Sequence, residues 1–114
     1  MRKEDINVNV TLDDANVCEQ ILWMATNTPD QGTNGAKAMS LSFWDEDGRG
    51  TAKMDLWTKK LEVHEMKAFC IETIAGLADT LRSATNDEAM AMDIDDLCRR
   101  LSQKLKQEME QQQQ

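Results

Sequence analysis

The first half of the chain alternates between apolar and polar residues with a period of two. From Ile6 to Leu12 the alternation is unbroken, which places four aliphatic side chains on one face of a strand. A turn rich in Asp and Asn follows at residues 13–16, and a second strand is predicted over Val17–Thr26. The second strand carries apolar residues on both faces, a pattern typical of a strand that is covered on both sides.

Two further strands are predicted after a surface loop at residues 27–35, which contains the only proline. They cover Ala36–Asp45 and Thr51–Trp57 and are joined by a glycine-containing hairpin connection. Together with the first two strands they predict one four-stranded antiparallel sheet.

The register of the second hairpin is predicted from its apolar residues. Phe43 opposite Met54, and Leu41 opposite Leu56, leaves a four-residue loop at 47–50 and gathers the apolar side chains on one face. The other face then carries polar residues together with two tryptophans: Ser40, Ser42, Lys53, Asp55, Trp44 and Trp57.

After Lys60 the period changes to about 3.6 residues, which predicts helices. The first helix falls between Val63 and Ala84, and its apolar stripe is Met66, Phe69, Cys70, Ile74, Leu77, Ala78 and Leu81. Asn86 is the predicted N-cap of a second helix, with the stripe Met90, Ile94, Leu97, Cys98, Leu101 and Leu105. The tight connection predicts antiparallel packing of the two helices.

These elements predict a single α+β domain over residues 1–105. In it, one face of the four-stranded antiparallel sheet packs against the two C-terminal helices. Residues 106–114 form a polar, Gln-rich tail that we expect to be a frayed helix end or disordered.

Composition narrows the choice of partners. With 21 acidic against 13 basic side chains, the net charge of −8 disfavours nucleic acid and anionic membrane surfaces. No apolar run approaches the roughly 20 residues of a membrane span, and the chain starts without a signal-peptide core. Three widely spaced cysteines favour reduced thiols over a disulfide framework. We therefore expect a soluble cytoplasmic protein with no nucleic-acid partner and no membrane insertion.

We expect no catalytic, cofactor or metal site. His64 is the only histidine and opens a helix, which favours a solvated side chain over a catalytic one. Asp45 and Asp47 are similar to the start of a calcium loop, but Leu56 stands where the bidentate glutamate is required. Residues 48–50 lack the helix and the lysine of a phosphate-binding loop. Enzymatic activity is therefore not expected.

The sulfur-containing residues favour packing roles. Cys70 and Cys98 fall on the helical stripes, where a thiol usually acts as a small apolar side chain. The eight methionines favour core filling over an adaptable surface that binds client proteins.

The tryptophans are the candidate interface. On the predicted register Trp44 and Trp57 leave the helix-covered face, with Lys53 between them, and Trp23 joins them if the second strand pairs accordingly. Large aromatic side chains on a polar sheet face suit self-association or partner docking, because they bury much apolar area at little cost in rotamer entropy. The alternative is that the loop at 27–35 or a chain terminus covers them.

Five short blocks, in the same order and at similar spacing, resemble the gliding-motility protein GldC family: Leu41–Asp45, Asp55–Lys59, Glu65–Lys67, Ile74–Leu81 and Ala84–Asp87. The resemblance runs from about Ile6 to Leu101. It implies a cytoplasmic accessory protein of Bacteroidetes gliding motility, a process tied in that phylum to a secretion machine of the outer envelope, and it implies no reaction. Asn86 stands where this family is expected to have glycine.

The leading expectation is a non-enzymatic accessory that contacts protein partners of the gliding or secretion machinery, or a second copy of itself through the open sheet face. One alternative is a holdase chaperone similar to the export chaperone SecB, which shares the order of four strands and two helices. A second alternative is a regulator that binds a small molecule or an ion.

Overall fold

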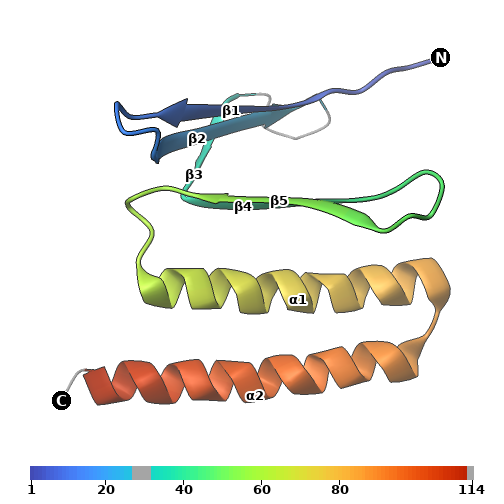
Figure 1. Ribbon diagram of the computed structural model, residues 1–114. Helices are drawn as coiled ribbons and strands as arrows, with labels where there is room; N and C mark the ends of the chain where they lie inside the picture. The colour runs from blue at the N-terminus through green and yellow to red at the C-terminus, as the bar shows by residue number, and fades with distance from the viewer. Residues whose placement is uncertain (27–31, 113–114) are drawn as a thin grey trace. The chain divides into compact units, whose positions relative to one another are not determined.

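The computed structural model describes residues 1–26 and 32–112 (Figure 1). The described chain contains five strands and two helices and divides into two compact units, Met1–Leu61 and Glu62–Gln114. All the strands fall in the first unit and both helices in the second, so the predicted α+β class is confirmed. Of the predicted loop at 27–35, residues 27–31 lie outside the described part of the chain.

Three strands form one antiparallel sheet in the order β1-β2-β3. These are β1 (Ile6–Leu12), β2 (Cys18–Ala25) and β3 (Asn34–Ala36). The bounds of β1 are those predicted from its alternation, and β2 lies within the predicted second strand. Val8 lies opposite Trp23 and Val10 opposite Ile21, so the aliphatic face of β1 continues onto β2.

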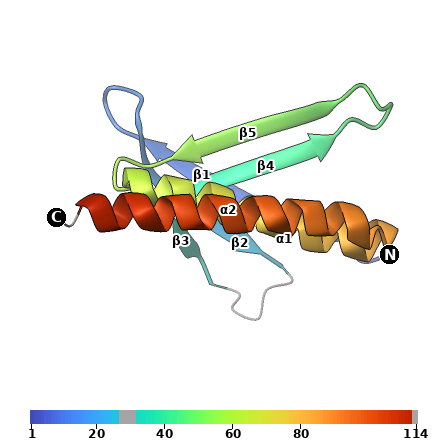
Figure 2. The ribbon, with the colours of Figure 1, turned by 90° about the horizontal axis from the view of Figure 1, so that it is seen from below.

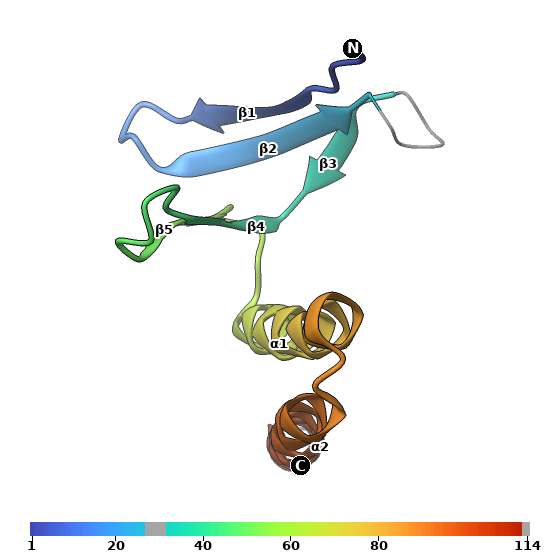
Figure 3. The same cartoon turned by 90° about the vertical axis from the view of Figure 1, so that its right-hand side faces the viewer.

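A second, two-stranded antiparallel sheet is formed by β4 (Ala38–Trp44) and β5 (Thr51–Trp57). The prediction of one four-stranded sheet is therefore wrong. The chain bends at Lys37, so that Ala36 pairs with β2 whereas Ala38 pairs with β5. Figure 3 shows β3 leading from the first sheet into β4. The bend divides what the sequence presents as a single strand between two ladders.

The register of the β4–β5 hairpin differs by two residues from the prediction, since Leu41 lies opposite Met54 and Phe43 opposite Ala52. The cause lies in the loop at 45–50. There the Asp45 N–H donates to Gly50 O at 2.8 Å. The Asp45 carboxylate accepts from the N–H groups of residues 47 and 49 at 3.0 and 3.3 Å. These bonds close a six-residue loop where a four-residue one was predicted.

Positive φ angles at two loop glycines, 77° for Gly48 and 130° for Gly50, suit this longer loop. A shift of two residues keeps every side chain on its predicted face, because side chains alternate with a period of two. The predicted division of the hairpin into an apolar and a mixed face is therefore retained.

The helical unit is an antiparallel pair of α1 (Val63–Thr85) and α2 (Glu88–Gln112) (Figure 1). Asn86 ends α1 in the left-handed conformation (φ 61°), and its N–H donates to Arg82 O. The Asp87 carboxylate accepts from the Met90 N–H at 3.0 Å. The capping residue of α2 is therefore Asp87, and the predicted N-cap Asn86 serves as the C-cap of α1. Asparagine tolerates this left-handed geometry better than most residues other than glycine.

The two helices meet along small side chains. Ala78 of α1 and Ala91 of α2 are each 0% exposed, and the thiol of buried Cys98 lies 3.8 Å from Ile71 O. Of the predicted stripes, Ala78 and Cys98 are buried, whereas Cys70 and Leu77 are exposed. Cys70 therefore lies outside the contact with α2, which is centred on a line of residues that includes Ile71 and Ala78, and its predicted packing role stays a prediction.

The predicted tail is helical as far as Gln112, since α2 continues through it without a break. The single domain over residues 1–105, and the packing of the helices against a sheet face, stay predictions.

Candidate functional site

The face of the β4–β5 hairpin that carries Trp44 and Trp57 is the candidate site predicted from the sequence. Trp44 lies opposite Thr51 and Trp57 lies opposite Ala38, so the two rings share a face but stand at opposite ends of the hairpin. At about 3.3 Å per residue, they are roughly 20 Å apart along the strands. Figure 2 shows the two strands running side by side over this length. Trp44 is 72% exposed and Trp57 55% exposed.

Polar side chains fill the face between the two tryptophans. Lys53 Nζ donates to both carboxylate oxygens of Asp55. This contact, together with a hydrogen bond from the Ser40 side chain, lowers the pKa of Asp55 below its ordinary value. Lys53 and Asp55 thus neutralise each other on the surface and form a polar strip with an aromatic ring at each end.

The opposite face of the hairpin is also apolar near the loop. Phe43 is 62% exposed and Met54 56% exposed, although the sequence pattern assigned both to the covered face. Phe43 and Trp44 are consecutive, so they project to opposite faces of β4. The loop end of the hairpin therefore presents Phe43, Trp44 and Met54 on its two sides. The sequence indicates this arrangement through the consecutive residues Phe43 and Trp44. Neighbouring residues of a strand project to opposite faces, so an element that packs on one face of the hairpin covers only one of the two rings.

Trp23 is placed apart from the other predicted interface residues. It lies in β2, opposite Val8 and Asn34, and is half-buried. The structure thus brings Trp44, Trp57 and Lys53 onto one hairpin face and leaves Trp23 in the other sheet.

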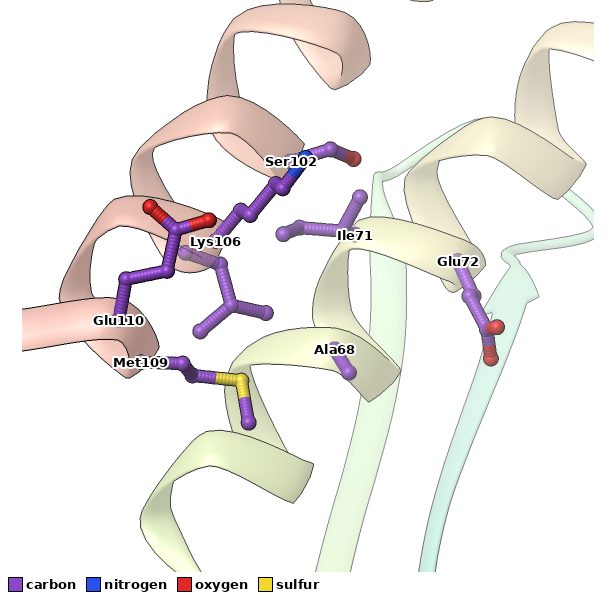
Figure 4. A pocket seen from close by; sticks show the side chains of 8 residues that line it. Ala68, Ile71, Glu72, Ser102, Lys106, Met109 and Glu110 are labelled. Atoms are coloured by element: carbon purple, nitrogen blue, oxygen red, sulfur yellow. The ribbon is translucent and has the colours of Figure 1, made fainter. Parts of the chain in front are cut away.

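A groove of about 440 Å³ between α1 and α2 is a feature that the sequence did not indicate (Figure 4). It is lined by Ala68, Ile71, Glu72, Ser102, Leu105, Lys106, Met109 and Glu110. Figure 4 shows Met109 reaching from α2 toward Ala68 on α1. Lys67 and Glu108 form a 2.7 Å ion pair between the same two helices. The lining is mainly apolar, with charged side chains of both signs around it.

The residues weighed for chemistry are placed in ordinary structural roles. His64 Nδ1 lies 3.3 Å from Glu62 Oε2 at the start of α1. Asp45 and Asp47 both bind the Arg49 side chain, at 3.1 and 2.8 Å. The N–H groups of Arg49 and Asp47, with the guanidinium, lower the pKa of Asp45. Within residues 1–26 and 32–112, no three His, Cys, Asp or Glu side chains are grouped as metal ligands would be.

Two ion-pair clusters stabilise the ends of elements. Lys59, which follows β5, pairs with Asp13 in the turn between β1 and β2 and lowers the pKa of that carboxyl to about 2. Arg82 pairs with Asp95, with Glu88 at 2.8 Å and with Asp79 at 3.2 Å. The contacts with Asp95 and then Glu88 raise the pKa of the guanidinium. Both clusters join segments of the same compact unit.

Within the described residues, neither α1 nor α2 has a stretch that is long and apolar enough to cross a bilayer. No curated protein and no solved structure matches the chain. The profile of one protein family, described as gliding motility-associated protein GldC-like, matches residues 18–107. This match takes in β2 to β5, α1, most of α2 and the candidate hairpin face. The chain therefore belongs to the GldC-like family of gliding motility-associated proteins.

Proposed function

We propose that the protein is a non-enzymatic accessory of the Bacteroidetes gliding-motility and secretion apparatus, and that it acts in the cytoplasm through protein contacts. Membership of the GldC-like family supports the process. The odd number of widely spaced cysteines supports a reducing compartment. The mechanism is docking of a partner protein on the β4–β5 hairpin.

The exposure of Trp44 is the observation that carries this proposal. Trp44 is 72% exposed beside the loop, and Trp57 is 55% exposed at the other end of the same face. Exposed tryptophans lose much solvent contact when a partner binds and dominate many interfaces. Two rings roughly 20 Å apart, with the Lys53–Asp55 pair between them, match the extent of a standard interface of about 800 Å² per partner.

The experiment compares Trp44→Ala, Trp57→Ala and the double variant with wild type in cross-linked pull-downs from the native organism. We expect each single variant to weaken capture of the same partner and the double variant to lose it. Met92→Ala is the matched control, because Met92 is an exposed apolar residue of α2. Circular dichroism must show an intact fold. Outright unfolding of the double variant would place the rings in a core and contradict the proposal.

A holdase activity is a second candidate, favoured by apolar side chains on both faces of one hairpin. Phe43, Trp44 and Met54 offer contacts to an extended apolar segment, and Met24 and Met90 are exposed as well. The test is light scattering of an aggregating model protein. Suppression that depends on Phe43 and Trp44 would support a holdase, whereas a dedicated partner-binder leaves the scattering unchanged.

A regulator that binds a small molecule or an ion is a third candidate, and the groove between α1 and α2 favours it. Its volume of about 440 Å³ lies within the range of small-ligand sites. A thermal-shift panel with calcium and nucleotides tests it. Stabilisation that is lost in Met109→Lys, which fills the groove with charge, would support this candidate, and no shift across the panel would remove it.

A further inference from the structure

The strand β1 presents an open edge. In the sheet order β1-β2-β3 it is an outer strand, and within the described residues no strand pairs with its other side. Six of its seven residues are exposed. Between Ile6 and Leu12 it contains no charged residue and no proline, which are the usual devices that keep an edge from pairing.

The backbone groups along this edge can be assigned from one hydrogen bond. Thr26 N–H donates to Asp5 O at 3.1 Å, so residue 5 turns its backbone groups toward β2. Inward and outward groups alternate in an antiparallel ladder, and the register pairs Asn7 with Met24 and Asn9 with Leu22. Residues 6, 8, 10 and 12 therefore direct their N–H and C=O groups away from β2.

The sequence of the strand is self-complementary about Asn9. In an antiparallel pair of two copies centred on this residue, Val8 lies opposite Val10, Ile6 opposite Leu12 and Asn7 opposite Thr11. Apolar side chains then meet apolar ones, and polar side chains meet polar ones. The outward groups of residues 8 and 10 face each other as a hydrogen-bonded pair, and Asn9 falls on the two-fold axis.

We propose that β1 is a homodimer interface, in which two copies of this chain pair antiparallel through their β1 edges to form a continuous six-stranded sheet. We assign the pairing strand to a second copy of this chain because residues 6–12 complement themselves about Asn9. An unrelated strand would match this pattern only by chance. The next pair outward places Asp5 opposite Asp13, and the Asp13 carboxylate already forms an ion pair with Lys59. All the residue pairs between these two ends of the interface are uncharged. This inference does not rest on the tryptophan face of the proposed function.

The test uses charge at the two-fold axis. Asn9 is exposed, so Asn9→Lys preserves the fold but places two like charges opposite each other in the dimer. We expect the dimer Kd, measured by sedimentation over a concentration series, to rise about fivefold. Asn7→Lys is the matched control, since it adds the same charge to the same face of β1 opposite neutral Thr11. It should leave the Kd nearly unchanged.

A mixing experiment distinguishes this interface from any other. Asn9→Lys and Asn9→Asp each weaken self-association alone, and an equimolar mixture should restore a heterodimer that weakens at high salt. A monomeric wild type at all concentrations would overturn the proposal, as would equal effects of Asn9→Lys and Asn7→Lys. A dimer that resists Asn9→Lys but is lost in Trp44→Ala would also overturn it, while leaving the tryptophan face as an interface.

Discussion

Asp13 and Lys59 form an ion pair that ties the turn between β1 and β2 to the segment after β5. The same Asp13 carboxylate accepts from the N–H groups of Ala15 and Val17 at 2.8 and 3.0 Å. One side chain therefore holds its own turn together and links the two sheets of the strand unit. The Lys59 contact, and then the Val17 N–H bond, lower the pKa of Asp13 to about 2.

The pH dependence of stability follows from this lowered pKa. A carboxyl whose pKa falls from 3.8 to about 2 on folding stabilises the fold fully above pH 3.8 and loses that contribution as the pH falls through 2. We expect Asp13→Asn to lower the free energy of unfolding at neutral pH. Its difference from wild type should shrink below pH 3.8 and vanish below pH 2. Acid titrations followed by circular dichroism measure this difference.

The matched control for Asp13 is Asp14→Asn, which removes one charge at the neighbouring exposed position. It should leave the acid titration close to that of wild type. If the difference in free energy of unfolding from wild type shrinks with acid in the same way for both variants, general charge repulsion and not the Lys59 pair determines the acid stability.

The register of the β4–β5 hairpin can be tested with an engineered disulfide. Ser42 lies opposite Lys53, and the bonds at residues 45–50 and 37–58 make this a non-hydrogen-bonded pair. Such pairs place Cα atoms about 4.5 Å apart, within the range a disulfide spans. We expect Ser42→Cys with Lys53→Cys to cross-link on oxidation in a Cys70→Ser background, since Cys70 is an exposed native thiol.

The comparison variant is Ser42→Cys with Asp55→Cys, which the register predicted from the apolar pattern would bring together. It should stay reduced under the same conditions, as judged by thiol titration and mass spectrometry. A faster cross-link in this second variant would show that the hairpin pairs two residues out of the observed register.

The sequence predicted strongly periodic elements well and failed where a local hydrogen bond decided the geometry. The bounds of β1 and β5 match their predictions because strict alternation leaves little freedom. The sequence prediction missed the bend at Lys37, because neither glycine nor proline interrupts residues 36–45. The hairpin register failed because a slip of two residues keeps the same faces, and only the Asp45 hydrogen bonds choose between the two.

The candidate site was predictable in part for the same reason. Side-chain parity placed Trp44 and Trp57 on one face, and the structure confirms that relationship. The alternation of side chains determines the face but not the position along the strands, so the sequence did not predict the distance between the two rings. The groove between the helices depends on which residues of α1 contact α2. The apolar stripe of each helix is too broad for the sequence to specify that line of contact.

Close packing of the helix pair predicts a cost for enlarging Ala91. Ala91 and Ala78 are fully buried where α1 and α2 approach each other. Ala91→Leu adds three carbons at this contact and should lower the free energy of unfolding by about 1–3 kcal/mol. Met92→Leu, at the exposed neighbouring position, should change it by less than about 0.5 kcal/mol. Urea denaturation measures both, and equal effects would mean that the helices are not in close contact at Ala91.

Thr58 carries a buried hydroxyl at the end of the β4–β5 ladder. The residue is 3% exposed, and its Oγ has no hydrogen-bond partner among the described residues. Its N–H donates to Lys37 O at 2.8 Å and so extends the β4–β5 ladder. Thr58→Val keeps this backbone bond and the shape of the side chain but removes the hydroxyl. We expect it to leave stability unchanged or to raise it by up to about 1 kcal/mol, because an unsatisfied buried polar group is penalised.

Thr58→Ser separates the contribution of the methyl group from that of the hydroxyl. It keeps the hydroxyl and deletes a buried methyl, so it should lower the free energy of unfolding by about 1 kcal/mol. Urea denaturation should then find Thr58→Val at least as stable as wild type, and Thr58→Ser less stable than both. If Thr58→Val is instead the least stable of the three, the hydroxyl makes a hydrogen bond in solution, and the buried end of the β4–β5 ladder is held by polar contacts as well as by packing.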